Sequence, residues 1–215
     1  MAAISESRNG DVRKECLESL DNLSTRKKQE DKKHYFDGYD GKKRWISYHN
    51  QIKEVLKTKP EEVLEIGLGN GTVSTYLSEI KNLDINTVDI DPMLDPDFVS
   101  PVEDLPFEKN SFDTVLCAEV LEHIPFDCFE KSLKEINRVS KNNAIITLPH
   151  RTLDIAFSLD FVPLVEEKGF LIKIPVARFM EHEFDGEHYW EIGKKNYSLD
   201  RIESIISDHF LIKNS

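Results

Sequence analysis

Residues 63–71 read Val-Leu-Glu-Ile-Gly-Leu-Gly-Asn-Gly. The first four residues predict a short buried strand, which Gly67 ends. Three glycines at alternate positions then let the backbone turn sharply and approach a ligand without a Cβ in the way. Apolar residues recur at helical spacing from Val73 to Ile80, so a helix follows the turn. This order of strand, turn and helix is typical of the first unit of a doubly wound nucleotide-binding fold.

Two details of the glycine turn narrow the choice of ligand. A dinucleotide-binding fingerprint requires glycine at position 72, where this chain has Thr72. Glu65 lies inside the strand, two residues before Gly67, and a carboxylate there repels a pyrophosphate but suits a ligand that carries positive charge. For the glycines alone, a tight turn that binds nothing is the alternative interpretation.

Residues 65–71 resemble the first motif of the class I S-adenosylmethionine-dependent methyltransferases, and further similar segments extend the resemblance over residues 60–149. The subgroup that it resembles includes small-molecule O- and C-methyltransferases. The resemblance implies an α/β fold with a Rossmann-like, doubly wound and mainly parallel sheet, and S-adenosylmethionine as the cofactor. The acid would lie near the cationic methionine end of the cofactor and the glycines beneath it. The residues assigned to this part of the site are Glu65, Gly67, Leu68, Gly69 and Gly71.

The next expected strand, residues 85–89, also ends in an acid. A carboxylate at that position can accept hydrogen bonds from both ribose hydroxyls of an adenosine cofactor. The resemblance gives this role to Asp89 and contact with the adenine face to Ile90. Asp91 is the alternative ribose ligand, and its position before Pro92 also predicts a helix N-cap.

Residues 102–107, Val-Glu-Asp-Leu-Pro-Phe, resemble the block that precedes the family's fourth strand. In relatives an aspartate just before this block binds the adenine amino group, but this chain has Pro101 there. We therefore expect backbone groups near Val102 and Glu103 to contact the adenine instead. An acidic surface loop is the alternative interpretation of this segment.

Residues 112–117 predict the fourth strand, and residues 144–148 the fifth. Parallel strands of such sheets present ligands beyond their C-terminal ends, where the strand order reverses. We therefore expect Cys117 and Glu119 to lie in the same crevice as Glu65.

Three histidines are candidates for a general base, because an imidazole accepts a proton near neutral pH. His150 is the first choice, since it follows the fifth expected strand; His123 and His188 are the others. The alternative for His150 is a hydrogen bond to a loop carbonyl, and for His123 a structural role together with Glu122. A base is not strictly required, because holding the nucleophile in line with the methyl group supplies much of the rate.

The sequence also predicts how the chain is divided. Residues 1–33 are polar and are expected to form an N-terminal arm, and residues 34–215 a single methyltransferase domain in which residues 151–195 are a substrate-side insert or cap. His182, Asp185 and His188 lack the HExxH spacing of a metal site, so we expect no metal ion.

Other segments carry weaker expectations. Trp45, His49, Ile52 and Leu56 recur at helical spacing, and analogy with the family makes Trp45, Tyr35 or Tyr39 a candidate for the acceptor pocket. Ser198 can cap a last helix, and residues 210–213 suggest a sixth strand. The last antiparallel strand of the family is not recognisable, so the sheet is expected to lack it.

The composition limits the possible partners. Lys and Arg number 28 against 40 Asp and Glu, a net charge of −12, which opposes binding to a polyphosphate backbone, so no nucleic acid is expected. Three cysteines without metal-ligand or disulfide spacing fit a reducing compartment. No apolar run is long enough to span a membrane, and the polar start is not a signal peptide. We expect a cytoplasmic protein, and the oligomeric state is not predicted.

Together these features predict an S-adenosylmethionine-dependent methyltransferase that transfers the methyl group to an O, N or C atom of a small molecule by in-line displacement. One alternative is a module that binds S-adenosylmethionine without turnover. The other is a nicotinamide-dependent oxidoreductase, which Thr72 and Glu65 disfavour.

Overall fold

The computed structural model describes residues 41–150, 153–158, 169–174 and 180–213. The predicted N-terminal arm, Tyr35 and Tyr39 lie outside these residues. No helix in the described ranges is long and apolar enough to cross a membrane.

Cys117 is a free thiol, whereas Cys128 is disulfide-bonded. The disulfide is contrary to the expectation from cysteine spacing, and the partner of Cys128 is outside the described residues.

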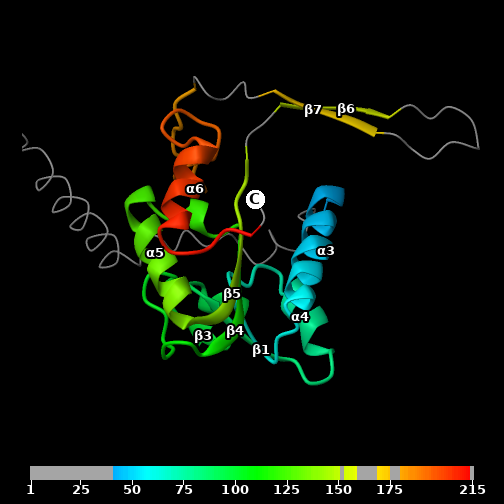
Figure 1. Cartoon of the computed structure of the whole chain (residues 1–215), viewed down its shortest axis with the longest axis vertical. Helices are drawn as coiled ribbons and strands as arrows, with labels where there is room; N and C mark the ends of the chain where they lie inside the picture. Colours follow the sequence, from blue (N-terminus) through cyan, green and yellow to red (C-terminus); the bar gives the residue numbers. More distant parts are fainter. Residues whose placement is uncertain (1–40, 151–152, 159–168, 175–179, 214–215) are drawn as a thin grey trace, which may run out of the picture.

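Five parallel strands form the central sheet, in the order β3-β2-β1-β4-β5 (Figure 1). The expected strands are confirmed with shifts of up to four residues at their ends, and the doubly wound parallel sheet is confirmed with them. The order runs in opposite directions on the two sides of β1, so a switch point lies between β1 and β4. The strand bounds are Glu62–Ile66 for β1, Asp84–Asp89 for β2, Phe98–Val99 for β3, Phe112–Ala118 for β4 and Ser140–Thr147 for β5.

Helices cover both faces of this sheet (Figure 1). Side chains of successive strand residues point to opposite faces, so Val63 packs in the cluster formed with α3 and α4, and Leu64 in the cluster formed with α5 and α6. The helix bounds are Lys42–Lys57 for α3, Thr72–Ser78 for α4, Phe126–Val139 for α5 and Leu199–Ser207 for α6, with 3-10 turns η2 at Pro92–Leu94 and η3 at Leu121–His123. A separate antiparallel pair consists of β6, Leu153–Ser158, and β7, Gly169–Ile174.

The helix expected before the glycine turn is confirmed as α3, but the side that it buries was predicted wrongly. Trp45 is 54% exposed and does not line the cavity described below. The residues buried on this helix are Tyr48, Gln51 and Val55, and the Tyr48 hydroxyl donates to Asn70 Oδ1 at 3.2 Å in the glycine turn. The inner face of α3 therefore consists of Tyr48, Gln51 and Val55, of which Val55 packs in the apolar cluster of Val63 and Leu77 while Tyr48 contacts the turn.

The end of the chain also differs from the prediction. Ser198 caps α6 by accepting from the backbone N–H of Arg201, as expected. Residues 210–213 form no strand, because Phe210 turns back and donates its backbone N–H to the Ile206 carbonyl at 2.9 Å. Among the described residues, no antiparallel strand joins the five-stranded sheet.

The first residue of the glycine turn has no room for a side chain. Gly67 has φ +84°, a conformation that L-residues with a side chain rarely adopt, and a Cβ there would lie 2.2 Å from Val120 Cγ2. The loop after β4 therefore packs directly against the backbone of the turn after β1.

We expect Gly67→Ala to lower the free energy of unfolding by about 2–4 kcal/mol, because it adds both left-handed backbone strain and a clash with Val120. Urea denaturation measures the change. Gly41→Ala is the matched control, since Gly41 has φ −73° and no atom within 4 Å of the added Cβ, and it should change stability by less than about 1 kcal/mol. Equal losses in the two variants would contradict the packing argument.

Candidate cofactor and acceptor site

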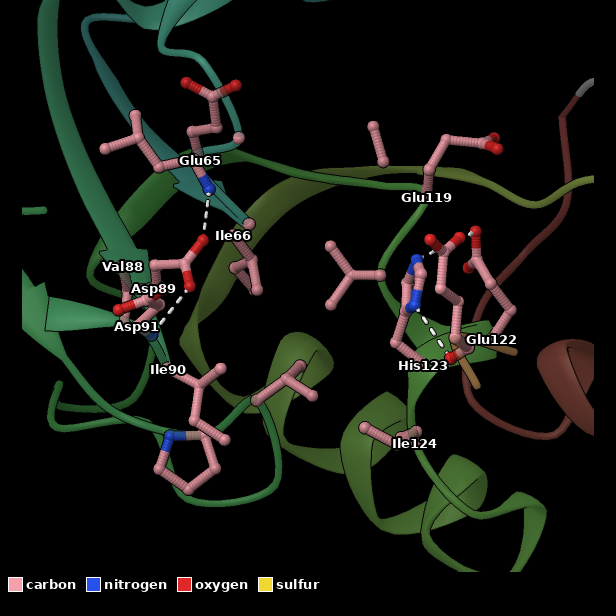
Figure 2. Close-up of a pocket in the computed structure, with 18 of the residues that line it drawn as sticks. Glu65, Ile66, Val88, Asp89, Ile90, Asp91, Glu119, Glu122, His123 and Ile124 are labelled. Atoms are coloured by element: carbon pink, nitrogen blue, oxygen red, sulfur yellow. Dashed lines mark hydrogen bonds and ion pairs between the residues drawn. The ribbon is translucent and has the colours of Figure 1, made fainter. Parts of the chain in front are cut away.

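A cavity of about 540 Å³ opens beyond the carboxyl ends of β1, β2 and β4, at the switch point of the sheet. One side of it is formed by the glycine turn and the end of β2 (Figure 2). The other side is formed by the loop after β4 and by residues 184–189, which we call the cap loop. Segments that are far apart in the sequence thus meet at this edge.

Glu65 is the buried acid of the turn side. Only 5% of the residue is exposed, and its Oε2 has no hydrogen-bond partner among the described residues. Burial raises the pKa of Glu65 to about 8, hydrogen bonding from Ser74 opposes this shift, and the nearby charge of Asp89 adds to it. A neutral acid at pH 7 becomes a carboxylate most readily beside a cation, so this position suits a positively charged ligand group.

Asp89 is the second acid of the turn side, and strand register explains its position. Ile66 pairs with Val88, so the next residue of β2 lies beside the glycine turn. Its Oδ2 accepts the backbone N–H of Leu68 at 2.7 Å, and its Oδ1 accepts that of Asp91 at 2.8 Å. Burial raises the pKa of Asp89, and these hydrogen bonds oppose the shift. Each carboxylate oxygen can still accept a second hydrogen bond from a ligand.

Asp91 also lines the cavity, and its Oδ1 accepts the backbone N–H of Met93 at 2.7 Å. The predicted N-cap is therefore confirmed, on a short 3-10 turn that starts at Pro92.

Most residues predicted to bind the cofactor line the cavity, but two do not. Gly71 is the N-cap of α4, with φ +71°, and is not among the residues that line the cavity. Cys117 is fully buried in β4, where burial strongly raises the pKa of its thiol. The predicted residues that do line the cavity are Glu65, Gly67, Leu68, Gly69, Asp89, Ile90, Val102, Glu103 and Glu119.

The three candidate bases are not equivalent in position. His150 is exposed and outside the cavity lining, and its backbone forms a β-bridge with Ile192. His123 and His188 both line the cavity, with ring centroids 4.8 Å apart. The His123 side chain is 43% exposed, and the burial of the rest of it, together with the charge of His188, lowers the pKa of His123 and favours the neutral imidazole.

Sequence reasoning missed several residues of this lining. Tyr48 and Gln51 face the cavity from α3, and helical spacing from Tyr48 to Val55 could have indicated this face. Glu122 lines the cavity although its sequence position suggested only a structural role. Phe184 belongs to the cap loop, for which the resemblance supplied no pattern.

The cap loop is fastened to the loop after β4 by three contacts. The Tyr189 backbone N–H donates to the Glu122 carbonyl at 2.8 Å, and His123 Nδ1 lies 3.0 Å from the Glu187 carbonyl oxygen. Trp190 is fully buried, and its Nε1 donates to the Ile124 carbonyl at 3.2 Å. Its ring packs edge-on against Phe126 and Phe129, with centroids 5.2 Å and 5.0 Å away. Trp190 therefore anchors the cap loop to α5.

The part of the chain around this cavity is similar to a known protein family. Residues 64–148 match the family described as "Methyltransferase domain". The match covers less than half of the chain and lies within the segment whose resemblance to the class I S-adenosylmethionine-dependent methyltransferases the sequence predicted. A comparison with curated proteins found no match.

Solved structures of similar fold share little sequence with this chain. The PH0226 protein of Pyrococcus horikoshii OT3 is 18% identical over 48% of this chain and 54% of its own, with a TM-score of 0.40. The YcgJ protein of Bacillus subtilis is 20% identical over 47% and 52%, with a TM-score of 0.39. A 1,6-didemethyltoxoflavin-N1-methyltransferase of Burkholderia thailandensis is 16% identical over 73% and 70%, with a TM-score of 0.45. The chain thus spans about half the length of the first two proteins.

We expect Trp190→Ala to destabilise the protein by about 3–5 kcal/mol, because it removes a fully buried indole and the anchor of the cap loop. Urea denaturation measures the loss, and limited proteolysis should show earlier cleavage within residues 180–195. Phe184→Ala is the control in the same loop, since Phe184 is 57% exposed. It should change stability by less than about 1 kcal/mol, and an equally large loss there would contradict the anchoring role.

Proposed function

We propose that this chain transfers the methyl group of S-adenosylmethionine to a small-molecule acceptor that binds beneath the cap loop. The observation that carries the proposal is Glu65, a buried carboxyl in the cavity lining whose Oε2 has no hydrogen-bond partner in the part of the chain that the structure describes. A buried polar atom without a partner is costly, and the cationic methionine end of S-adenosylmethionine would satisfy it.

The other residues of the turn side fit the same cofactor. A Cβ added at Gly69 would meet no atom within 4 Å, so the backbone of the turn borders open space that a ligand can enter. Asp89 holds the turn and keeps acceptor capacity for the ribose hydroxyls, with Ile90 beside it for the adenine. Val102 and Glu103 line the cavity close to the predicted adenine position.

The remaining part of the cavity suits a small acceptor. The whole cavity has a volume of about 540 Å³, within the range of roughly 300–1,000 Å³ that is usual for sites of small ligands and cofactors. The net charge of −12 disfavours polyanionic acceptors such as nucleic acids. We therefore assign the cap loop, within the predicted insert of residues 151–195, to acceptor binding. The cytoplasmic location of the protein remains a prediction from the sequence.

The main task of this chain in the reaction is to position the acceptor atom relative to the methyl group. The sulfonium supplies an activated methyl group, and the protein holds the acceptor atom in line with it. His123 and His188 lie at the cavity, whereas His150 does not, so we place the acceptor side at the first two. A neutral imidazole there can accept a proton from the acceptor.

Calorimetry with S-adenosylhomocysteine, followed by assays of its formation from S-adenosylmethionine with a panel of small acceptors, tests the proposal. Binding without turnover across a broad panel would favour the non-catalytic module. A melting temperature raised by a nicotinamide cofactor but not by S-adenosylhomocysteine would favour the oxidoreductase.

We expect Asp89→Ala to weaken S-adenosylhomocysteine binding by about 1–3 kcal/mol, through lost hydrogen bonds to the ribose and a loosened turn. Titration calorimetry measures the affinity. Asp113→Ala is the matched control, because Asp113 Oδ2 also accepts two backbone N–H groups, those of Glu61 and Glu62, but at the opposite end of the sheet. If Asp89→Ala binds normally and Asp91→Ala does not, the ribose role belongs to Asp91.

We expect S-adenosylmethionine binding at pH 7 to release a proton from Glu65. The pKa of Glu65 in the free protein is about 8, and the bound cation lowers it. Because the complex holds fewer protons, affinity should rise by up to about tenfold per pH unit from pH 6 to 8 and level off above that. Calorimetry in buffers of different ionisation enthalpy counts the protons.

Glu65→Gln is the control for this linkage, because an amide cannot titrate. It should abolish the buffer dependence of the heat and flatten the pH profile of the affinity. Wild-type heats that are the same in all buffers would contradict the placement of the cation beside Glu65.

A further inference from the structure

Three side chains of metal-binding type meet on the acceptor side of the cavity. Glu122 and His123 come from η3, after β4, and His188 comes from the cap loop. One ligand atom from each lies within 4.8 Å of those of the other two. Glu122 Oε1 is 4.0 Å from His123 Nε2. Figure 2 shows the two side chains next to each other. Only the fold creates this group, because His188 is remote from the other two in the sequence.

Glu122 has no structural explanation in the described part of the chain. The residue is 1% exposed, and neither carboxylate oxygen has a hydrogen-bond partner there. A buried carboxyl with both oxygens unsatisfied is strongly unfavourable in a protein interior. A ligand that supplies positive charge at this point would remove the penalty.

The hydrogen bond of His123 prepares its other nitrogen for a metal ion. Its Nδ1 lies 3.0 Å from the Glu187 carbonyl oxygen, which can only accept, so Nδ1 carries the proton. Nε2 then presents its lone pair on the side of Glu122. Histidine ligands of metal ions are commonly held this way, with the second ring nitrogen donating to a backbone carbonyl.

His188 is held in place by its neighbours in the cap loop. Its backbone N–H donates to Asp185 Oδ1 at 2.8 Å, and its carbonyl oxygen lies 2.8 Å from His182 Nε2. The side chain is 22% exposed, and its Nδ1 has no hydrogen-bond partner in the described residues. The imidazole is therefore held at the edge of the cavity, where its Nδ1 also lies 3.5 Å from Asp185 Oδ2 and 3.7 Å from Glu191 Oε1.

We propose that Glu122, His123 and His188 bind a divalent transition-metal ion, with Zn²⁺ and Mn²⁺ as the probes of choice. Two imidazoles and one carboxylate are a ligand set for such ions, and three protein ligands leave a coordination position open. Ligand atoms around a four-coordinate ion are roughly 3–3.5 Å apart, so binding draws the present group together by about 1 Å. This ion site differs from the expectation of no metal, which considered only the spacing of His182, Asp185 and His188.

The ion deepens the proposed function, and this step rests on it. A hydroxyl oxygen of the acceptor occupies the open position, and coordination lowers its pKa so that its proton passes to water, because His123 and His188 then bind the ion and do not act as bases. The oxygen then forms a bond to the methyl carbon while the carbon–sulfur bond breaks. The electron pair of that bond stays on sulfur, which leaves as a neutral thioether. The acceptor is thereby predicted to be a hydroxyl compound that can coordinate a metal ion.

The ion itself is tested without any acceptor or cofactor. The full chain is treated with chelator and titrated with MnCl₂ or ZnCl₂ by calorimetry, and bound Mn²⁺ is followed by electron paramagnetic resonance. We expect one ion per chain, and affinity at least about tenfold lower in Glu122→Gln and in His123→Gln. His49→Gln is the matched control, because His49 is an exposed residue of α3 outside the cavity lining, and it should bind the ion as the wild type does.

Two results would overturn the ion site. One is the absence of binding by the wild-type chain, and the other is loss of binding in Asp185→Asn but not in Glu122→Gln, which would move the ion to the neighbouring group of Asp185, His188 and Glu191. Titration of the same samples with S-adenosylhomocysteine separates this test from that of the proposed function. Glu122→Gln should keep cofactor affinity, and a chain that binds the cofactor but no ion refutes only the metal proposal.

Discussion

The carboxylate of Asp89 joins the two backbone segments on which the cavity depends. It accepts the N–H of Leu68 in the glycine turn and the N–H of Asp91 where the chain leaves β2. Two further contacts hold the turn in place. The Gly67 backbone N–H donates to the Val88 carbonyl at 2.9 Å, and Gly67 packs against Val120. The ends of β1, β2 and β4 are therefore fixed relative to one another before any ligand arrives. A site built on rigid strand ends can hold a cofactor with little rearrangement.

Two buried acids mark opposite sides of the cavity. Burial is the main cause that raises the pKa of both Glu65 and Glu122 to about 8, and both carry carboxylate oxygens without hydrogen-bond partners. Acids with strongly shifted pKa values concentrate at functional sites, because the fold accepts their burial where a ligand compensates it. The two proposals give each acid a cation, the methionine end of the cofactor at Glu65 and a metal ion at Glu122. The reacting methyl group would lie between them.

The cap loop connects a variable part of the chain to the common core. The resemblance to the methyltransferases ends near residue 149, yet Tyr189 and Trp190 hydrogen-bond to the loop after β4, inside the matched segment. The lining of the cavity is therefore shared between the two parts, with Glu122 and His123 from the matched segment and His188 from the cap loop. Such an arrangement lets a loop determine specificity while the sheet keeps the cofactor site unchanged.

Local sequence was sufficient for β1, β2, β4 and β5, the glycine turn, the Asp91 and Ser198 caps and most of the residues on the turn side of the cavity. Hydrophobic period, glycine spacing and the acid at each strand end act within a few residues, so they can be recognised without a structure. Three further features depend on contacts between distant residues. One is the inner face of α3, where Tyr48 meets Asn70, and another is the outward position of His150. The third is the group that His188 forms with Glu122 and His123. No rule of sequence spacing could have joined His188 to Glu122 and His123, because their separation in space is set by the packing of the cap loop around Trp190. The residues on the turn side of the cavity were thus predictable from the chain itself, whereas the group of Glu122, His123 and His188 exists only once the tertiary fold has brought its parts together.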